Sequence, residues 1–351
     1  MDIQASSQKD IVRDTAKDKN LTLQQKLALH LEERKREPAA SPRNLNKYLP
    51  IVFLAEVMVV WYYGTCQGIP FLYADFGEEV IIVIQGICSF MAVQMLLNWW
   101  CVYTVSSAYD PHRHGTYLEF LDRQQSQTSS QVTTSIDVQS RQYGAGGSTN
   151  GSTSGSPSRP PYWSWRYCTV CDQPRPPRCH HCKLCNRCSL KRDHHCFFSR
   201  NCIGYRNLRH YTVMMFWCCA SSVVGFVHAL PFIFMEVLPS TGHVDMLPFV
   251  AIFRWIFGYA HFRVGLVILG TWMLALFIIF TTFMLYDICR CILKGKTSFE
   301  IDNNIKINDT RSVNSKVRAA FGDFWLLNFL LPMHWRFHPD EDPVFWPTIN
   351  Q

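Results

Sequence analysis

The chain has 351 residues, of which 48% are hydrophobic and 17% are charged, against roughly 25% charged residues in an average soluble protein. A net charge of +7 is too small to indicate nucleic-acid binding by itself. The chain has 15 cysteines, and its first 46 residues are polar and charged, so we expect neither a signal peptide nor a secreted disulfide framework. Close cysteine pairs beside histidines instead favour metal binding in a reducing compartment.

Four apolar segments are long enough to cross a bilayer, which takes about 20 residues as a helix. They cover roughly residues 48–68, 80–104, 212–235 and 264–286. Glu56 lies inside the first segment, and Trp and Tyr gather at several segment ends, as an interfacial belt requires. We therefore expect an α-helical multi-pass membrane protein with four transmembrane helices. A shorter apolar stretch at 248–257 is interpreted as interfacial or re-entrant.

Lys and Arg are distributed unevenly between the loops. They are frequent before the first segment, between the second and third, and after the fourth, and they are rare in the other two connections. By the positive-inside rule, both termini and the long middle loop are cytosolic. Within that loop, residues 124–161 are rich in Ser, Gln, Thr and Gly, a composition that predicts a flexible linker.

These patterns predict six consecutive units, with a small cysteine-rich domain between transmembrane helices 2 and 3. The unit at 162–211 is that zinc domain, which metal would staple together. The others are a cytosolic N-terminal segment (1–47), transmembrane helices 1–2 (48–109), a cytosolic segment with the flexible linker (110–161), transmembrane helices 3–4 (212–287) and a cytosolic C-terminal segment (288–351).

A dense group of cysteines and histidines lies in the middle loop. Tetrahedral zinc takes four thiolate or imidazole ligands, and Cys-x2-Cys turns supply two at a time. Eight candidates make two sites: Cys168, Cys171, His181, Cys182, Cys185, Cys188, His195 and Cys202. Metal would replace the core that so short a segment cannot build. The spacing does not fix the pairing, although repeated turns suggest an interleaved arrangement; the alternative is unrelated cysteines beside a membrane.

Asp193, His194 and Cys196 remain once His195 is assigned to metal. An imidazole beside a thiol lowers its pKa or takes its proton, and the thiolate is the nucleophile. Asp193 would accept the other ring N–H and fix the tautomer. The alternative is that Cys196 is a further zinc ligand. Nine ligands are one too many for two tetrahedral sites, which favours a free thiol.

The run "CTVCDQPRPPRCHHCKLCNRCSLKRDHHCFFSRNCIGYRNLRHY" resembles the cysteine-rich domain of the DHHC-type protein S-acyltransferases, or palmitoyltransferases. The Asp-His-His-Cys run, the "NCIG" run at 201–204 and Asn207 fall where that family has them. The layout of four apolar segments also matches. The resemblance covers about residues 45–335.

The resemblance implies a role for each matching position. Cys196 would be the nucleophile, His194 its base and Asp193 the orienting acid. The "TSFE" run at 297–300 is similar to the family's Thr-Thr-x-Glu motif, so Ser298 would contact Asp193. One zinc would be held by Cys168, Cys171, His181 and Cys188, and the other by Cys182, Cys185, His195 and Cys202.

Other positions bear on acyl-CoA. Phe197-Phe198 stands where the family usually has Pro-Trp, and that Trp lies close to the acyl thioester in relatives. Phe198 would keep the aromatic face without the indole N–H, and the loss of Pro frees the backbone. The corresponding motif is basic in the family, so Arg175 and Arg178 are candidates for the CoA phosphates. The alternative for each is a lipid-headgroup or solvated charge.

The implied activity is protein S-acyl transfer. A long-chain acyl group of the palmitoyl class would pass from the co-substrate acyl-CoA through Cys196 to membrane-proximal cysteines of substrate proteins, with two structural zinc ions. Membrane lipid is an expected partner and nucleic acid is not. Golgi and endoplasmic reticulum are the family's usual locations. The alternatives are a weakly active or inactive membrane-anchored zinc module acting as a scaffold, and a nucleic-acid-binding CCHC knuckle, which the flanking apolar segments disfavour.

Overall fold

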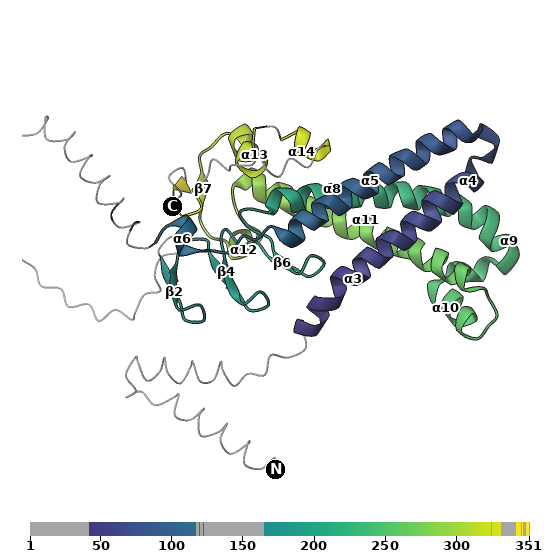
Figure 1. Cartoon of the computed structure of the whole chain (residues 1–351), viewed down its shortest axis with the longest axis horizontal. Coiled ribbons are helices and arrows are strands. Elements are labelled where there is room, and N and C mark those ends of the chain that lie inside the picture. Colours follow the sequence, from purple (N-terminus) through teal and green to yellow (C-terminus); the bar gives the residue numbers. More distant parts are fainter. Residues whose placement is uncertain are drawn as a thin grey trace, which may run out of the picture.

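The computed structural model describes residues 42–116, 119, 122, 165–323, 325–330, 342–344, 346 and 349–350. The linker predicted at 124–161 and nearly all of the N-terminal segment predicted at 1–47 lie outside the described residues. In the described part, long helices run alongside one another, and a region of short strands lies at one end of them (Figure 1).

Within the described residues, four helical stretches are long and apolar enough to cross a membrane: Asn46–Leu72, Glu78–Thr104, Leu208–Thr241 and Phe262–Lys294. The first comprises α3 (Pro42–Trp61), the π-helical η1 (Tyr62–Gly68) and α4 (Ile69–Leu72), and the second is α5 (Glu78–Thr104). The third comprises α8 (Leu208–Phe232), η3 (Ile233–Val237) and α9 (Leu238–Thr241), and the fourth is α11 (Phe262–Lys294). The four predicted membrane helices are confirmed, and the last two extend further toward the strand-rich region than their apolar runs suggest.

The helices turn apolar side chains outward. Ile82, Ile279 and Phe283 are each at least 60% exposed, which water would penalise at about 25 cal/mol per Å² of apolar surface. Lipid removes that penalty, and helices satisfy their own backbone hydrogen bonds in hydrocarbon. α8 packs against both α5 and α11 and is the central helix of the bundle.

The connections at the far end of the bundle are short and helical. η2 (Ala74–Phe76) joins α4 to α5, while η4 (His243–Met246) and α10 (Pro248–Ile256) join α9 to α11. Arg254 Nη1 on α10 pairs with the buried Asp245 at 2.8 Å, which fixes this connection. The apolar stretch at 248–257 is therefore largely a helix packed against α11; its interfacial or re-entrant position stays a prediction.

Three antiparallel hairpins form the cysteine-rich region. They are β1 (Arg166–Cys168) with β2 (Gln173–Arg175), β3 (His180–Cys182) with β4 (Arg187–Ser189), and β5 (His195–Cys196) with β6 (Asn201–Cys202). Each strand has two or three residues, too few for an isolated hairpin to be stable in water. The region therefore depends on cross-links other than its strand pairing.

The segment after α11 returns to the cysteine-rich region. Gly295 ends α11 in the left-handed conformation, with φ of +66°, which glycine adopts without steric cost. A capping box between Thr297 and Glu300 starts α12 (Ser298–Asp302). α6 (Pro111–His114) follows α5, and the remaining elements are β7 (Asn308–Asp309) paired with β8 (Ile349–Asn350), α13 (Val313–Phe321) and α14 (Leu327–Leu330).

Asn207 joins the helices to the cysteine-rich region. It is fully buried, and its Oδ1 accepts hydrogen bonds from Ser107 Oγ at 3.1 Å and from the Gly204 N–H at 2.9 Å. Its Nδ2 donates to the carbonyl oxygens of Val105 at 3.0 Å and Cys202 at 2.9 Å. One amide thus ties the chain after α5, the last metal-binding hairpin and the start of α8 together.

Replacing Asn207 with Ala should lower the free energy of unfolding by about 2–4 kcal/mol, because it leaves buried hydrogen-bond donors and acceptors without their partner. Thermal unfolding of the detergent-solubilised full chain measures the loss. Asn303→Ala is the matched control, since the exposed Asn303 side chain donates one hydrogen bond to Phe299 O. Equal midpoints for the two variants would show that Asn207 does not hold the junction.

Candidate active site and metal clusters

Two metal-binding clusters share the β3–β4 hairpin. Cluster 1 is Cys168, Cys171, His181 and Cys188, and cluster 2 is Cys182, Cys185, His195 and Cys202. His181 lies opposite Cys188, and Cys182 lies opposite Arg187. Because neighbouring residues on a strand point to opposite faces, His181 serves one cluster and Cys182 the other. The clusters are therefore interleaved.

The ligand atoms have the spacing that zinc requires. Bonds of about 2.3 Å to sulfur and 2.1 Å to nitrogen in a tetrahedron place ligands roughly 3.4–3.8 Å apart. In cluster 1, His181 Nδ1 lies 3.6 Å from Cys168 Sγ, 3.2 Å from Cys171 Sγ and 4.0 Å from Cys188 Sγ. In cluster 2, His195 Nδ1 lies 3.3–3.8 Å from the three sulfurs. Both donor sets fit structural zinc, which would cross-link the hairpins.

Asn46 supports cluster 2 from outside the cysteine-rich region. Its Oδ1 lies 3.0 Å from His195 Nε2, and both side chains are buried. A hydrogen bond to the second ring nitrogen fixes the tautomer and orientation of a metal-binding histidine. Asn46 lies in α3, so the first membrane helix orients a ligand of cluster 2.

The β5–β6 hairpin separates a metal-binding face from a reactive face. His195 lies opposite Cys202, and Cys196 lies opposite Asn201. His195 and Cys202 belong to cluster 2, whereas Cys196 packs into an apolar cluster with Trp99, among others. Among the residues that the structure describes, Cys196 belongs to neither metal cluster.

His194 lies between an acid and the thiol. Its Nδ1 is 2.8 Å from Asp193 Oδ2, and its interaction with the nearby Cys196 thiol raises the pKa of the imidazole. Because Asp193 occupies Nδ1, Nε2 is the ring nitrogen that remains for the thiol. The Tyr211 ring meets the His194 ring edge to face, with centroids 5.1 Å apart. The imidazole can therefore accept a proton from the thiol in a fixed orientation.

Charge separation is favoured within this group. Burial alone would raise the pKa of the Cys196 thiol, but its interactions with His194 and with the Ser199 backbone outweigh burial and lower that pKa. Burial would lower the pKa of His194, whereas hydrogen bonds with Asp193 and Cys196 raise it to about 9. Burial also opposes ionisation of Asp193, yet the bonds from His194 and Ser298 hold its pKa below the ordinary value. The arrangement favours a thiolate beside an imidazolium.

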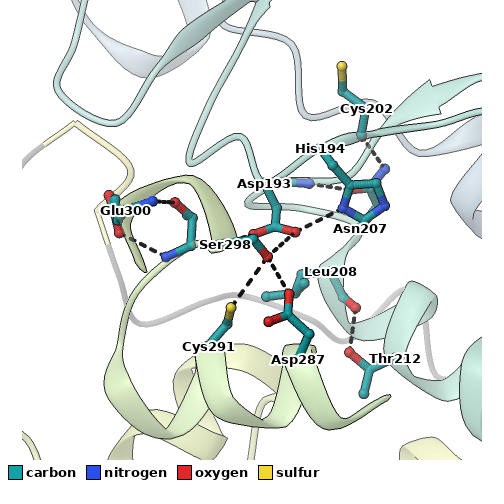
Figure 2. A network of polar contacts seen from close by, with 12 residues as sticks. Asp193, His194, Cys202, Asn207, Leu208, Thr212, Asp287, Cys291, Ser298 and Glu300 are labelled. Carbon is teal, nitrogen blue, oxygen red and sulfur yellow. Dashed lines mark hydrogen bonds and ion pairs between the residues drawn. The ribbon is translucent and has the colours of Figure 1, made fainter. Parts of the chain in front are cut away.

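Ser298 contacts the acid of this group, as Figure 2 shows. Its backbone N–H donates to Asp193 Oδ1 at 2.6 Å, and its Oγ lies 3.1 Å from Asp193 Oδ2. The same Oγ lies 2.7 Å from Asp287 Oδ2 and 3.5 Å from Cys291 Sγ, both on α11. The end of the fourth membrane helix is thus linked through Ser298 to Asp193, which contacts His194.

Aromatic side chains surround Phe198, two residues after the thiol. Phe198 packs against Phe53, Phe277 and Phe280, with ring centroids about 6 Å apart. The Trp99 indole N–H donates to Phe198 O at 3.0 Å. Without the family's proline, the backbone here is held by this hydrogen bond from α5.

An apolar groove lies between the membrane helices, next to the aromatic side chains around Phe198. Its empty volume is about 830 Å³, part of which is open to the surroundings. Phe53, Met95, Cys218 and Phe277 line the groove and also pack in or against the apolar cluster that holds Cys196. The groove therefore reaches the surroundings of the thiol.

The two arginines predicted to hold phosphate have protein partners. Arg178 is 2% exposed and binds Glu300 through two contacts of 2.7 Å; its Nη2 also donates to Gly295 O at 3.0 Å. Arg175 donates to the carbonyl oxygen of Cys179 and is half-buried. A role for Arg178 in holding phosphate would require its ion pair to open, and phosphate binding by both residues stays a prediction.

The structure brings together residues that sequence reasoning missed. Asn46, Trp99, Asp287 and Glu300 all contact the site or its metal clusters. None stands at a characteristic spacing from the cysteine-rich run. Glu300 alone carried a signal, as the last position of the "TSFE" run, and the others depend on how the helices pack.

The purified full chain should contain two zinc ions, one for each cluster. Cys185→Ser removes a thiolate from cluster 2 and should lower the zinc content by about one ion per chain. Cys179→Ser, buried in the same region but outside both clusters, should keep both ions. Elemental analysis measures the content; an unchanged value for Cys185→Ser would rule out cluster 2.

Comparisons with known proteins agree with this site. A family model described as DHHC palmitoyltransferase matches residues 163–305. Palmitoyltransferase ZDHHC22 of Rattus norvegicus is 28% identical over 209 residues, which are 53% of this chain and 66% of that protein. Palmitoyltransferase PFA4 of Eremothecium gossypii is 54% identical over 65 residues, 18% of this chain and 17% of that protein. With the interleaved clusters and the Asp-His-His-Cys run, these matches identify residues 163–305 as a DHHC palmitoyltransferase domain.

Proposed function

We propose that the protein is a protein S-acyltransferase that moves a long-chain acyl group, of the palmitoyl class, from acyl-CoA to cysteines of substrate proteins. The observation that carries this proposal is the β5–β6 hairpin, where His195 faces cluster 2 and the next residue, Cys196, stays outside both clusters. A thiol fixed in place, beside an imidazole that is itself held by Asp193, is the arrangement that nucleophilic catalysis needs.

The first half-reaction loads the enzyme. His194 takes the Cys196 proton, and the thiolate attacks the thioester carbonyl of acyl-CoA. The bond between the carbonyl carbon and the CoA sulfur breaks, and the CoA thiolate takes the proton from His194. Asp193 keeps the imidazole ring in its orientation through its contact with Nδ1. The product is an acyl thioester on Cys196 and free CoA.

The second half-reaction reverses these roles. A substrate cysteine gives its proton to His194, and its sulfur attacks the acyl carbonyl on Cys196. The bond to Cys196 breaks, and its thiolate recovers the proton from His194. The enzyme returns to its starting state, and the substrate protein carries the thioester. The zinc ions would only hold the hairpins that place these residues.

The apolar groove explains why the reaction is placed at a membrane. Moving an acyl chain from lipid into water costs about 0.8 kcal/mol per CH₂. A chain lying in the groove among Phe53, Val57 and Phe277 avoids this cost while its thioester reaches Cys196. Substrate cysteines would then lie close to the membrane surface.

The proposed placement follows the charge distribution between the helices. Both termini and the zinc domain would be cytosolic, in a Golgi or endoplasmic-reticulum membrane, where cytosolic acyl-CoA is available. Arg175 and Arg178 remain the proposed contacts of the CoA phosphates. The matched region covers just under two thirds of the rat relative, so the substrates and partners are part of the proposal.

The acyl thioester should form on Cys196. We expect purified wild-type protein to take up label from palmitoyl-CoA, and neutral hydroxylamine to remove it, because hydroxylamine cleaves thioesters. Cys196→Ser should lose this label and keep two zinc ions, since Cys196 is outside both clusters. Cys289→Ser, at the exposed cysteine of α11, is the control and should load normally. Full hydroxylamine-sensitive labelling of Cys196→Ser would exclude Cys196 as the acylated residue, and the absence of label on wild type would support the scaffold alternative.

Trp99→Phe should slow loading by about fivefold, because it removes one hydrogen bond that holds the backbone after Cys196. The aromatic ring remains, so packing is little changed. Trp272→Phe is the matched control, since that indole donates to Met246 O at 2.9 Å in the connection that joins α9 to α11. Single-turnover labelling measures both rates, and equal rates for the two variants would show that Trp99 does not restrain the site.

A further inference from the structure

Ser298 lies between two carboxylates. Its Oγ is 3.1 Å from Asp193 Oδ2 and 2.7 Å from Asp287 Oδ2 (Figure 2). A hydroxyl has one proton to donate, so it cannot donate fully to both. The shorter distance assigns the proton to Asp287. Asp193 already receives the Ser298 backbone N–H at 2.6 Å, so it remains bonded to Ser298 through the main chain.

Asp287 is held in turn by Arg290. The two side chains are on α11, three residues apart, and Arg290 Nη2 lies 2.5 Å from Asp287 Oδ1. Two carboxylates sharing one hydroxyl repel each other, and a guanidinium on the outer oxygen offsets part of that repulsion. Asp287 therefore has one oxygen on Arg290 and the other on Ser298.

We propose that Asp287 is a positioning residue for the acyl-loading step, acting on His194 through Ser298 and Asp193. This inference rests on the proposed acyltransferase function. Asp287 is on a 33-residue helix, whereas Ser298 begins a five-residue helix that is too short to be stable alone. The contact with Asp287 on the long helix therefore fixes the position of Ser298 on the short helix.

Loss of the Asp287 carboxylate should weaken the contact between Asp193 and His194. The Ser298 hydroxyl would turn to Asp193 Oδ2, the same oxygen that His194 Nδ1 contacts at 2.8 Å. An oxygen that accepts a strong second hydrogen bond is a poorer acceptor for the imidazole. His194 would then be held less firmly in the orientation that takes the Cys196 proton.

The test measures the loading rate of the full chain with palmitoyl-CoA in detergent. Asp287→Ala should lower the saturated rate about tenfold, as expected for a hydrogen bond to a charged group, with the half-saturating concentration unchanged. Asp287→Asn should retain most of the rate, since its carbonyl still accepts the Ser298 hydroxyl. In a Ser298→Ala background, Asp287→Ala should cause no further loss, because the hydroxyl through which it acts is gone.

Controls separate this role from a structural one. Arg290→Ala removes the other partner of Asp287 and should slow loading less than Asp287→Ala does. Zinc content and thermal midpoint identify variants that remain folded, and Asp287→Leu, which has the same branching but no hydrogen-bond acceptor, replaces the alanine variant if that one loses zinc. A wild type that does not load would refute the proposed function. If wild type loads, either of two results would overturn the positioning role alone. One is a loading rate of Asp287→Ala equal to that of wild type. The other is that Asp287→Ala causes the same loss in the Ser298→Ala background as it causes in the wild-type background.

Discussion

The alternation of side chains along a strand is the constraint on which this site depends. Two consecutive residues of β5, His195 and Cys196, point to opposite faces, so anchoring the first determines the position of the second. The pairing of His195 with Cys202 puts two ligands of cluster 2 on one face. The other face presents the thiol to the apolar ends of the helices. A candidate metal ligand and the proposed nucleophile are thus separated by one peptide bond.

The membrane helices provide further contacts that hold the hairpins in place. Asn46 from α3 orients the His195 ring, Trp99 from α5 holds the backbone at Phe198, and Asn207 at the start of α8 ties the hairpin to the chain after α5. A cysteine-rich region lacking a core of its own is therefore fixed on three of the four membrane helices. These contacts lie where the helix ends meet the strand region, so the thiol is held at that boundary.

Local patterns in the sequence predicted the parts whose physics is local. Twenty apolar residues specify a membrane helix, and paired Cys-x2-Cys turns specify tetrahedral metal, so the four helices and the two clusters were predictable. Asn46 was not, since it contacts His195, 149 residues away in sequence. Asp287 was not, since its contact with Ser298 depends on how the chain turns after α11. The partner of Arg178 was missed for the same reason: a basic run suggested a phosphate ligand, whereas the fold places Glu300 against it.

The buried Arg178–Glu300 pair also explains how the short α12 can act on the site. Both side chains are 0% exposed, and removing one partner of such a pair typically costs about 3–5 kcal/mol. Glu300 also accepts the Thr297 N–H in the capping box that starts α12. The charge that starts the helix is therefore the charge that binds it to the cysteine-rich region. Ser298, two residues earlier, is placed against Asp193 as a consequence, so α12 links the end of the fourth membrane helix to the loop that carries Asp193 and His194.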